Sequence, residues 1–72
     1  MSAGLPAGPL ESAPGGTVPE AERLAILAGA LDGVELGAWD WRVAGWLAGL
    51  GTSTALTIAS WIVRAREAGQ GQ

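Results

Sequence analysis

Residues 36–68 read LGAWDWRVAGWLAGLGTSTALTIASWIVRAREA, and this stretch decides the fold of the 72-residue chain. Apolar residues recur in it at every third or fourth position, which is the periodicity of an α-helix. Residues 49–53 (GLGTS) interrupt this pattern with glycines that suit the end of one helix and hydroxyl residues that suit the start of the next. We therefore predict one helix over 36–50 and another that continues to about Ala68.

The helix expected over 36–50 is apolar on both sides. One face carries most of its large side chains: Trp39, Val43, Trp46, Leu47 and Leu50. The opposite face is formed by Trp41, Ala44, Gly45 and Ala48. A helix of this kind is buried on more than one side, but a chain this short has little core to cover both sides. We expect Trp39 and Trp46 to lie in the core, and the opposite face, with Trp41, to contact a second copy or another protein.

The last helix is amphipathic. Its apolar face consists of Ala55, Leu56, Ile58, Ala59, Ile62 and Val63. Its polar face consists of Thr57, Ser60, Arg64 and Glu67. Trp61 lies beside the polar face, and tryptophan is enriched among the residues that dominate the energy of protein interfaces. We therefore add Trp61 and Arg64 to the candidate interface.

A first helix is expected to begin at Thr17, because Thr17 and Glu20 have the spacing of a capping box. Its apolar positions, at helical spacing, are Leu24, Leu27, Ala28 and Leu31. The pair Asp32-Gly33 is a turn signal that ends it. Residues 17–68 then form an all-α domain, a small three-helix bundle.

The segment before this domain, residues 1–16, reads MSAGLPAGPLESAPGG and is rich in proline and glycine. Proline removes backbone donors and glycine raises the entropic cost of ordering, so we predict a flexible, disordered tail. Gly15-Gly16 also has the form of a processing site of a secreted peptide, and an ordinary linker is the simpler interpretation. At the other end, residues 69–72 are predicted to fray.

The composition argues against catalysis. Seven acidic residues stand against four arginines, for a formal net charge of −3, and the chain contains no histidine, cysteine or lysine. Serine and threonine therefore have no imidazole to activate them as nucleophiles. Transition metals lack their usual nitrogen and sulfur ligands. We predict no catalytic, cofactor-binding or metal site and no enzymatic activity.

A helix-turn-helix DNA-binding regulator is one alternative. Its turn would lie at Gly49 and its reading helix would start at Ser53. Affinity for DNA comes mainly from the neutralisation of phosphates, which an acidic chain supplies poorly. This function would need Arg42, Arg64 and Arg66 to cluster, for example in a dimer, so nucleic acid is not the favoured partner.

A membrane-associated small protein is a second alternative, because residues 43–63 contain no charge and have roughly the length that spans a bilayer. Gly45 and Gly49 form a G-x-x-x-G pair, which lets membrane helices approach closely. Against this stands the polar sequence GTST at 51–54, which is typical of a turn and a helix cap. We expect two separate helices and a cytoplasmic protein.

Four segments carry a resemblance: LDGVELGAWD (31–40), WLAG (46–49), TST (52–54) and IASWI (58–62). In these the chain resembles short helical proteins of actinobacterial genomes, phages and integrated elements. The resemblance implies a helical protein and adds no functional site. With the exposed apolar face it leads us to expect a non-enzymatic protein–protein interaction module, an accessory protein of a phage or mobile element, that forms a homo-oligomer or binds a protein partner.

Overall fold

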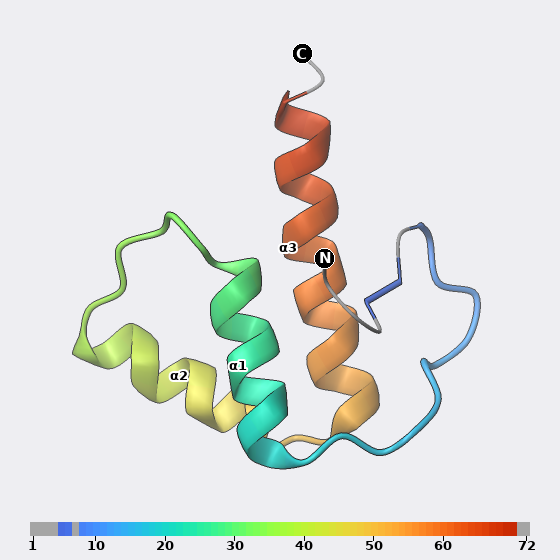
Figure 1. Ribbon diagram of the computed structural model, residues 1–72, viewed down its shortest axis with the longest axis horizontal. Coiled ribbons are helices and arrows are strands. Elements are labelled where there is room, and N and C mark those ends of the chain that lie inside the picture. Colours follow the sequence, from blue (N-terminus) through green and yellow to red (C-terminus); the bar gives the residue numbers. More distant parts are fainter. Residues whose placement is uncertain (1–4, 7, 71–72) are drawn as a thin grey trace.

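The computed structural model describes residues 5–6 and 8–70, and these residues form three α-helices and no strand. The helices are α1 (Glu20–Ala30), α2 (Ala38–Ala48) and α3 (Thr52–Gln70) (Figure 1). The predicted all-α, three-helix fold is therefore confirmed.

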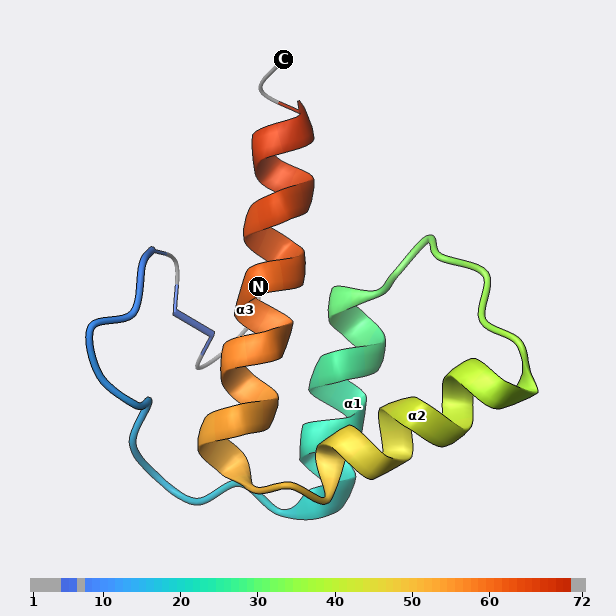
Figure 2. The same ribbon diagram turned by 180° about the vertical axis from the view of Figure 1, so that it is seen from behind.

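The three helices are arranged around α1, which packs against both α2 and α3, while α2 and α3 contact each other least. Figures 1 and 2 show α1 and α3 side by side, with α2 leading away from α3. The C-terminal half of α3 extends beyond the other two helices. As a result, one long side of α2 has no helix against it.

The predicted break between the last two helices is confirmed. The N–H of Gly49 donates to the carbonyls of Gly45 and Trp46 and ends α2, and α3 begins three residues later, at Thr52. Gly51 lies between them with a φ of +116°. Among the described residues, no helix has both the length and the apolar character that crossing a membrane requires.

Replacing Gly51 by alanine is expected to destabilise the fold by about 1–3 kcal/mol, because a residue with a Cβ is strained at this φ. The matched control is Gly45→Ala. Gly45 lies inside α2 with open space around the position of a Cβ, so alanine there should raise the stability by about 0.5–1 kcal/mol. Chemical unfolding of the two variants measures both effects. Equal stabilities would show that the turn does not depend on glycine.

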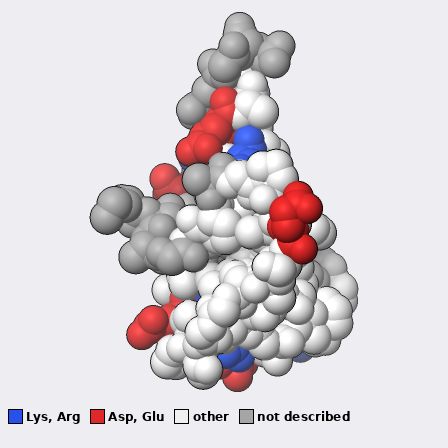
Figure 3. Space-filling view, turned by 90° about the vertical axis from the view of Figure 1, so that its right-hand side faces the viewer, with Lys and Arg blue, Asp and Glu red and all other residues white. Residues whose placement is uncertain are grey.

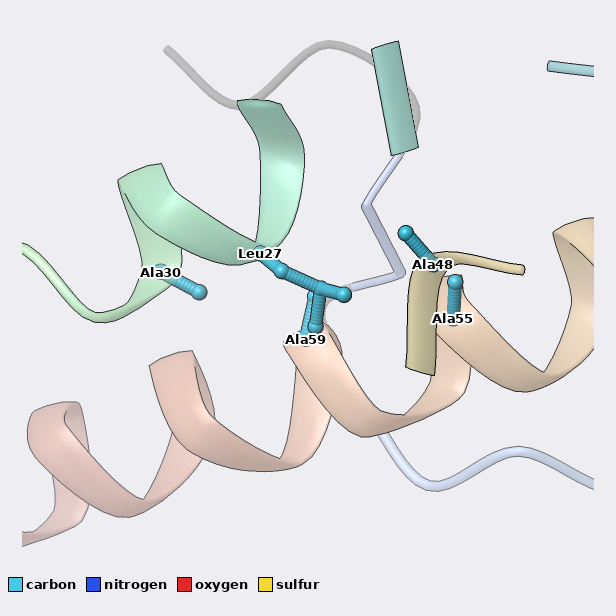
Figure 4. Close-up of a cluster of buried hydrophobic side chains, with 5 residues drawn as sticks. All are labelled: Leu27, Ala30, Ala48, Ala55 and Ala59. Carbon is cyan, nitrogen blue, oxygen red and sulfur yellow. The ribbon is translucent and has the colours of Figure 1, made fainter. Parts of the chain in front are cut away.

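The centre of the core is made almost entirely of small side chains. Leu27 of α1 is 1% exposed and projects towards α3. Figure 4 shows it with the other members of the buried cluster, Ala30, Ala48, Ala55 and Ala59. Alanine lets helix backbones approach one another closely, so the packing around α1 depends on the alanine faces of its two neighbours.

The orientation of α2 differs from the prediction. Trp39 and Trp46 are 70% and 64% exposed, whereas Ala44 and Ala48 are buried, so the expectation of a core formed by these tryptophans is wrong. The physical reason is that both faces of α2 are apolar and only one of them can meet α1. The alanine face matches the small residues of the core, and the bulky face remains in solvent.

The ends of the helices also differ from the prediction. The first helix begins at Glu20, and Pro19 is its N-cap without a side-chain hydrogen bond, so the capping box at Thr17 does not form. Val18 precedes a proline, which disfavours helical geometry there. Helix α2 begins at Ala38. The carboxylate of Asp40 caps this end by accepting a hydrogen bond of 2.8 Å from the N–H of Gly37. Helix α3 includes residues 69–70, where we predicted fraying.

The segment before α1 contains no helix or strand in its described part, residues 5–6 and 8–19. It nevertheless contacts α3. The hydroxyl of Ser60 donates to the carbonyl of Pro6 at 2.9 Å, and the hydroxyl of Ser53 donates to that of Pro14 at 3.3 Å. The described part of this segment therefore lies along α3, its flexibility stays a prediction, and residues 1–4 and 7 lie outside the described residues.

Candidate functional site

Three of the four arginines donate hydrogen bonds within the chain, and two of them, Arg23 and Arg66, join different helices. Arg23 donates to the carbonyls of Val18 and Ala48, which joins the start of α1 to the end of α2. Arg66 donates to the carbonyl of Ala30 at 2.9 Å and so satisfies the C-terminal end of α1. The Nε of Arg64 donates to the Ser60 hydroxyl at 3.1 Å. These guanidinium groups serve contacts within the chain.

The residues predicted as an interface do not form one surface. Ala44 and Ala48 are 4% and 0% exposed and Gly45 is half-buried, so this face of α2 is the side that packs on the core. A partner could reach these alanines only if the helices separated, and this part of the prediction is therefore corrected. Trp41, at the edge of the same face, is 46% exposed.

Trp61 and Arg64, the other two predicted interface residues, lie on α3. Trp61 is exposed, and together with Ser53, Thr54, Thr57 and Ile58 it lines a shallow depression on that helix. Arg64 is half-buried through its contact with Ser60. This depression is smaller than the groove on α2 described next and is lined mainly by hydroxyl residues.

Four exposed apolar residues, among them the two tryptophans that were expected in the core, form a stripe on and just beyond α2, which we call the outer face. It consists of Trp39, Val43, Trp46 and Leu50. The intervals of four and three residues place Trp39, Val43 and Trp46 on one side of the helix, opposite Ala44 and Ala48, and the exposed Leu50 follows in the turn just beyond the end of α2. The same spacing was visible in the sequence, but it could not say which of two apolar faces would be left exposed.

The middle of the outer face is hollowed. Trp39, Arg42, Val43 and Trp46 line a shallow groove of about 470 Å³. The two tryptophans are seven residues apart, which separates them by about 10.5 Å along the helix axis. Val43 lies between them, and the exposed Arg42 adds a cation within reach of both indole rings. The groove can accept one large apolar or aromatic side chain between two aromatic walls.

The surface shows little concentration of charge. On the side of the molecule that Figure 3 shows, acidic and basic side chains of the described residues are scattered over a mostly uncharged surface. Within the part of the chain that the structure describes, no three acidic residues come together as they would at a metal site.

Comparison with known proteins adds no assignment to this geometry. No protein-family model matches the chain, and neither a curated protein nor a solved structure is significantly similar to it.

Proposed function

We propose that this chain is a non-enzymatic protein-binding module and that the outer face of α2 is its contact surface. The observation that carries the proposal is the exposure of Trp39 and Trp46, at 70% and 64%, on one stripe of a single helix. Tryptophan is enriched among the residues that dominate binding energy, and contiguous exposed apolar patches mark contact sites.

The contrast within α2 strengthens this proposal. The helix buries alanines and leaves two tryptophans in water, although a tryptophan side chain offers several times the apolar area of alanine. In an isolated chain that area contributes little to folding. A partner that covers it would gain the transfer free energy which the fold leaves unused. We propose the cytoplasm as the place where this binding occurs.

Site-specific photo-cross-linking tests the proposal. A photoreactive phenylalanine replaces Trp39 or Trp46 in the cells that produce the protein, and the matched control carries it in place of Trp61, which has similar exposure on α3. We expect one defined protein, either the chain itself or another, to be linked at positions 39 and 46 and not at position 61. A chain that stays unlinked at both α2 positions contradicts the proposal.

Nucleic acid provides a separate prediction. Arg66 and Arg64 already donate hydrogen bonds within the fold, and the net charge is −3. We expect no measurable binding to mixed-sequence duplex DNA at physiological salt, and only a small salt dependence, because roughly one unit of slope accompanies each neutralised phosphate. Titration of labelled duplex and single strand at two salt concentrations checks this. Tight, salt-sensitive binding that disappears when Arg64 and Arg66 become alanine would favour a DNA-binding regulator instead.

A further inference from the structure

The outer face of α2 has the residue spacing of a helix–helix seam. Trp39, Val43 and Trp46 follow one another on α2 at intervals of four and three residues, the repeat by which two helices pack knobs into holes, and Leu50 follows in the turn beyond the helix. We propose that a second copy of this chain covers the face, with α2 packed antiparallel on α2 about a two-fold axis. This inference rests on the proposed function, which requires only that the face binds some protein.

The spacing of the two tryptophans fits this occupant. An aromatic ring placed halfway along the groove, at the level of Val43, would lie about 5 Å from each wall, within the 4.5–7 Å typical of aromatic pairs. An antiparallel second copy can place its own Trp46 there. Two-fold symmetry then places the Trp46 of the first copy between the two tryptophans of the second, and all four rings interleave.

The remaining residues of the stripe fit the same register. When Trp46 of one copy lies at the level of Val43 of the other, Leu50, just beyond the end of α2, lies near the level of the other copy's Trp39. Leu50 of each copy thereby covers the outermost tryptophan, Trp39, of the other. An antiparallel arrangement also sets the two helix dipoles in opposite directions, which favours their association.

The area is that of a small interface. With their observed exposures, the four residues of the stripe offer roughly 500 Å² per copy, so the pair would bury at most roughly 1,000 Å² through them. This is below the roughly 1,200–2,000 Å² of stable complexes, so we expect a weak, concentration-dependent pair. Chains of this length bury a small fraction of their surface alone, and association is a common way of adding to their stability.

Sedimentation over the micromolar range tests the second copy. We expect the mass to rise from 7.2 kDa to twice that value with concentration. Trp46→Ser should weaken association at least tenfold, because it removes one of the interleaved rings from each side of the pair. Trp61→Ser, which deletes an equally exposed tryptophan from α3, should associate as the unaltered chain does. A chain that stays at 7.2 kDa throughout, or an equal loss in both variants, overturns the proposal.

Single cysteines test the orientation, since the chain has none of its own. In the antiparallel register the two copies of position 43 are offset by about 4.5 Å along the axis, and for helix axes about 8–10 Å apart their Cα atoms are about 6–7 Å apart. The two copies of position 50, just beyond the end of α2, lie at opposite ends of the seam. A disulfide bridges Cα atoms up to about 7 Å apart. We expect Val43→Cys to form a disulfide-linked dimer on oxidation and Leu50→Cys to remain monomeric. Equal linkage at both positions would indicate parallel helices and contradict the register.

The failures of the two proposals are distinguishable. If the chain is monomeric in sedimentation while positions 39 and 46 photo-cross-link to a different protein, the second copy is wrong and the proposed function stands. If the chain is monomeric and neither position cross-links, both proposals fail.

Discussion

Replacing Ala48 by glutamate is expected to unfold the protein at room temperature. Ala48 is fully buried in the cluster around Leu27, so the new carboxylate would lose its water, and the neighbouring cation, Arg23, already donates to the carbonyls of Val18 and Ala48. Burying an unpaired charge costs several kcal/mol, and the larger side chain adds overpacking. A domain of this size has about 4–10 kcal/mol of stability in total, and this single change removes most of it. Far-ultraviolet circular dichroism and thermal unfolding measure the loss of helix.

The matched control is Ala38→Glu, an exposed position in the first turn of the same helix, where a carboxylate is favourable. Its helicity and melting temperature should equal those of the unaltered chain. The comparison also decides the orientation of α2. If Ala48 faced a partner, as the sequence alone suggested, the glutamate would separate copies of the chain and leave its helicity intact. Retained helicity in the Ala48 variant would therefore show that the alanine face of α2 is exposed and not buried.

The helices and their break could be predicted from local signals. Glycines at 49 and 51 followed by hydroxyl residues define the end of one helix and the start of the next, and Asp32-Gly33 marks the end of the first. In the structure, α1 ends at Ala30 and Gly33 has a φ of +88° in the following turn. These signals depend only on neighbouring residues, so they needed no knowledge of the packing.

The rotation of α2 about its own axis could not be predicted in the same way. Periodicity identifies the faces of a helix, and it selects the buried face only when the other is polar. In α2 both faces are apolar, and the face with the larger side chains, Trp39 and Trp46, was expected to be buried. The choice depends on the surface that α1 and α3 present, where Leu27 is surrounded by Ala30, Ala55 and Ala59 in the buried cluster that Ala48 joins.

The role of Ser60 was missed for a related reason. It was assigned to the polar face of the last helix, yet it is fully buried, because its hydroxyl donates to Pro6 and accepts from Arg64. Pro6 precedes Ser60 by 54 residues, and no local pattern reports a contact over that distance. The same holds for Arg23, whose bonds to Val18 and Ala48 join two helices. The sequence showed these groups as polar positions and could not show which carbonyls they would meet.

Leu27→Ala should have the second large effect, a loss of about 2–5 kcal/mol in the free energy of unfolding. Leu27 is the only leucine among the largest fully buried side chains of the described residues, and it fills the space between α1 and α3. The other members of the buried cluster are alanines, and larger apolar side chains such as Leu24 and Ile62 pack against it. These neighbours relax only partly into the space that Leu27 leaves, so a cavity term adds to the transfer term.

Leu50→Ala is the matched control for this measurement, because it deletes the same atoms from a leucine that is 46% exposed. Chemical unfolding is carried out at a concentration so low that the chains are monomeric. Association through the outer face of α2 then does not contribute to the measured free energy of unfolding. Under these conditions Leu50→Ala should change the free energy of unfolding by less than about 1 kcal/mol. Similar losses in the two variants would mean that Leu27 is not the centre of the core. A large difference would confirm that Leu27 is central to the packing of α1 on α3.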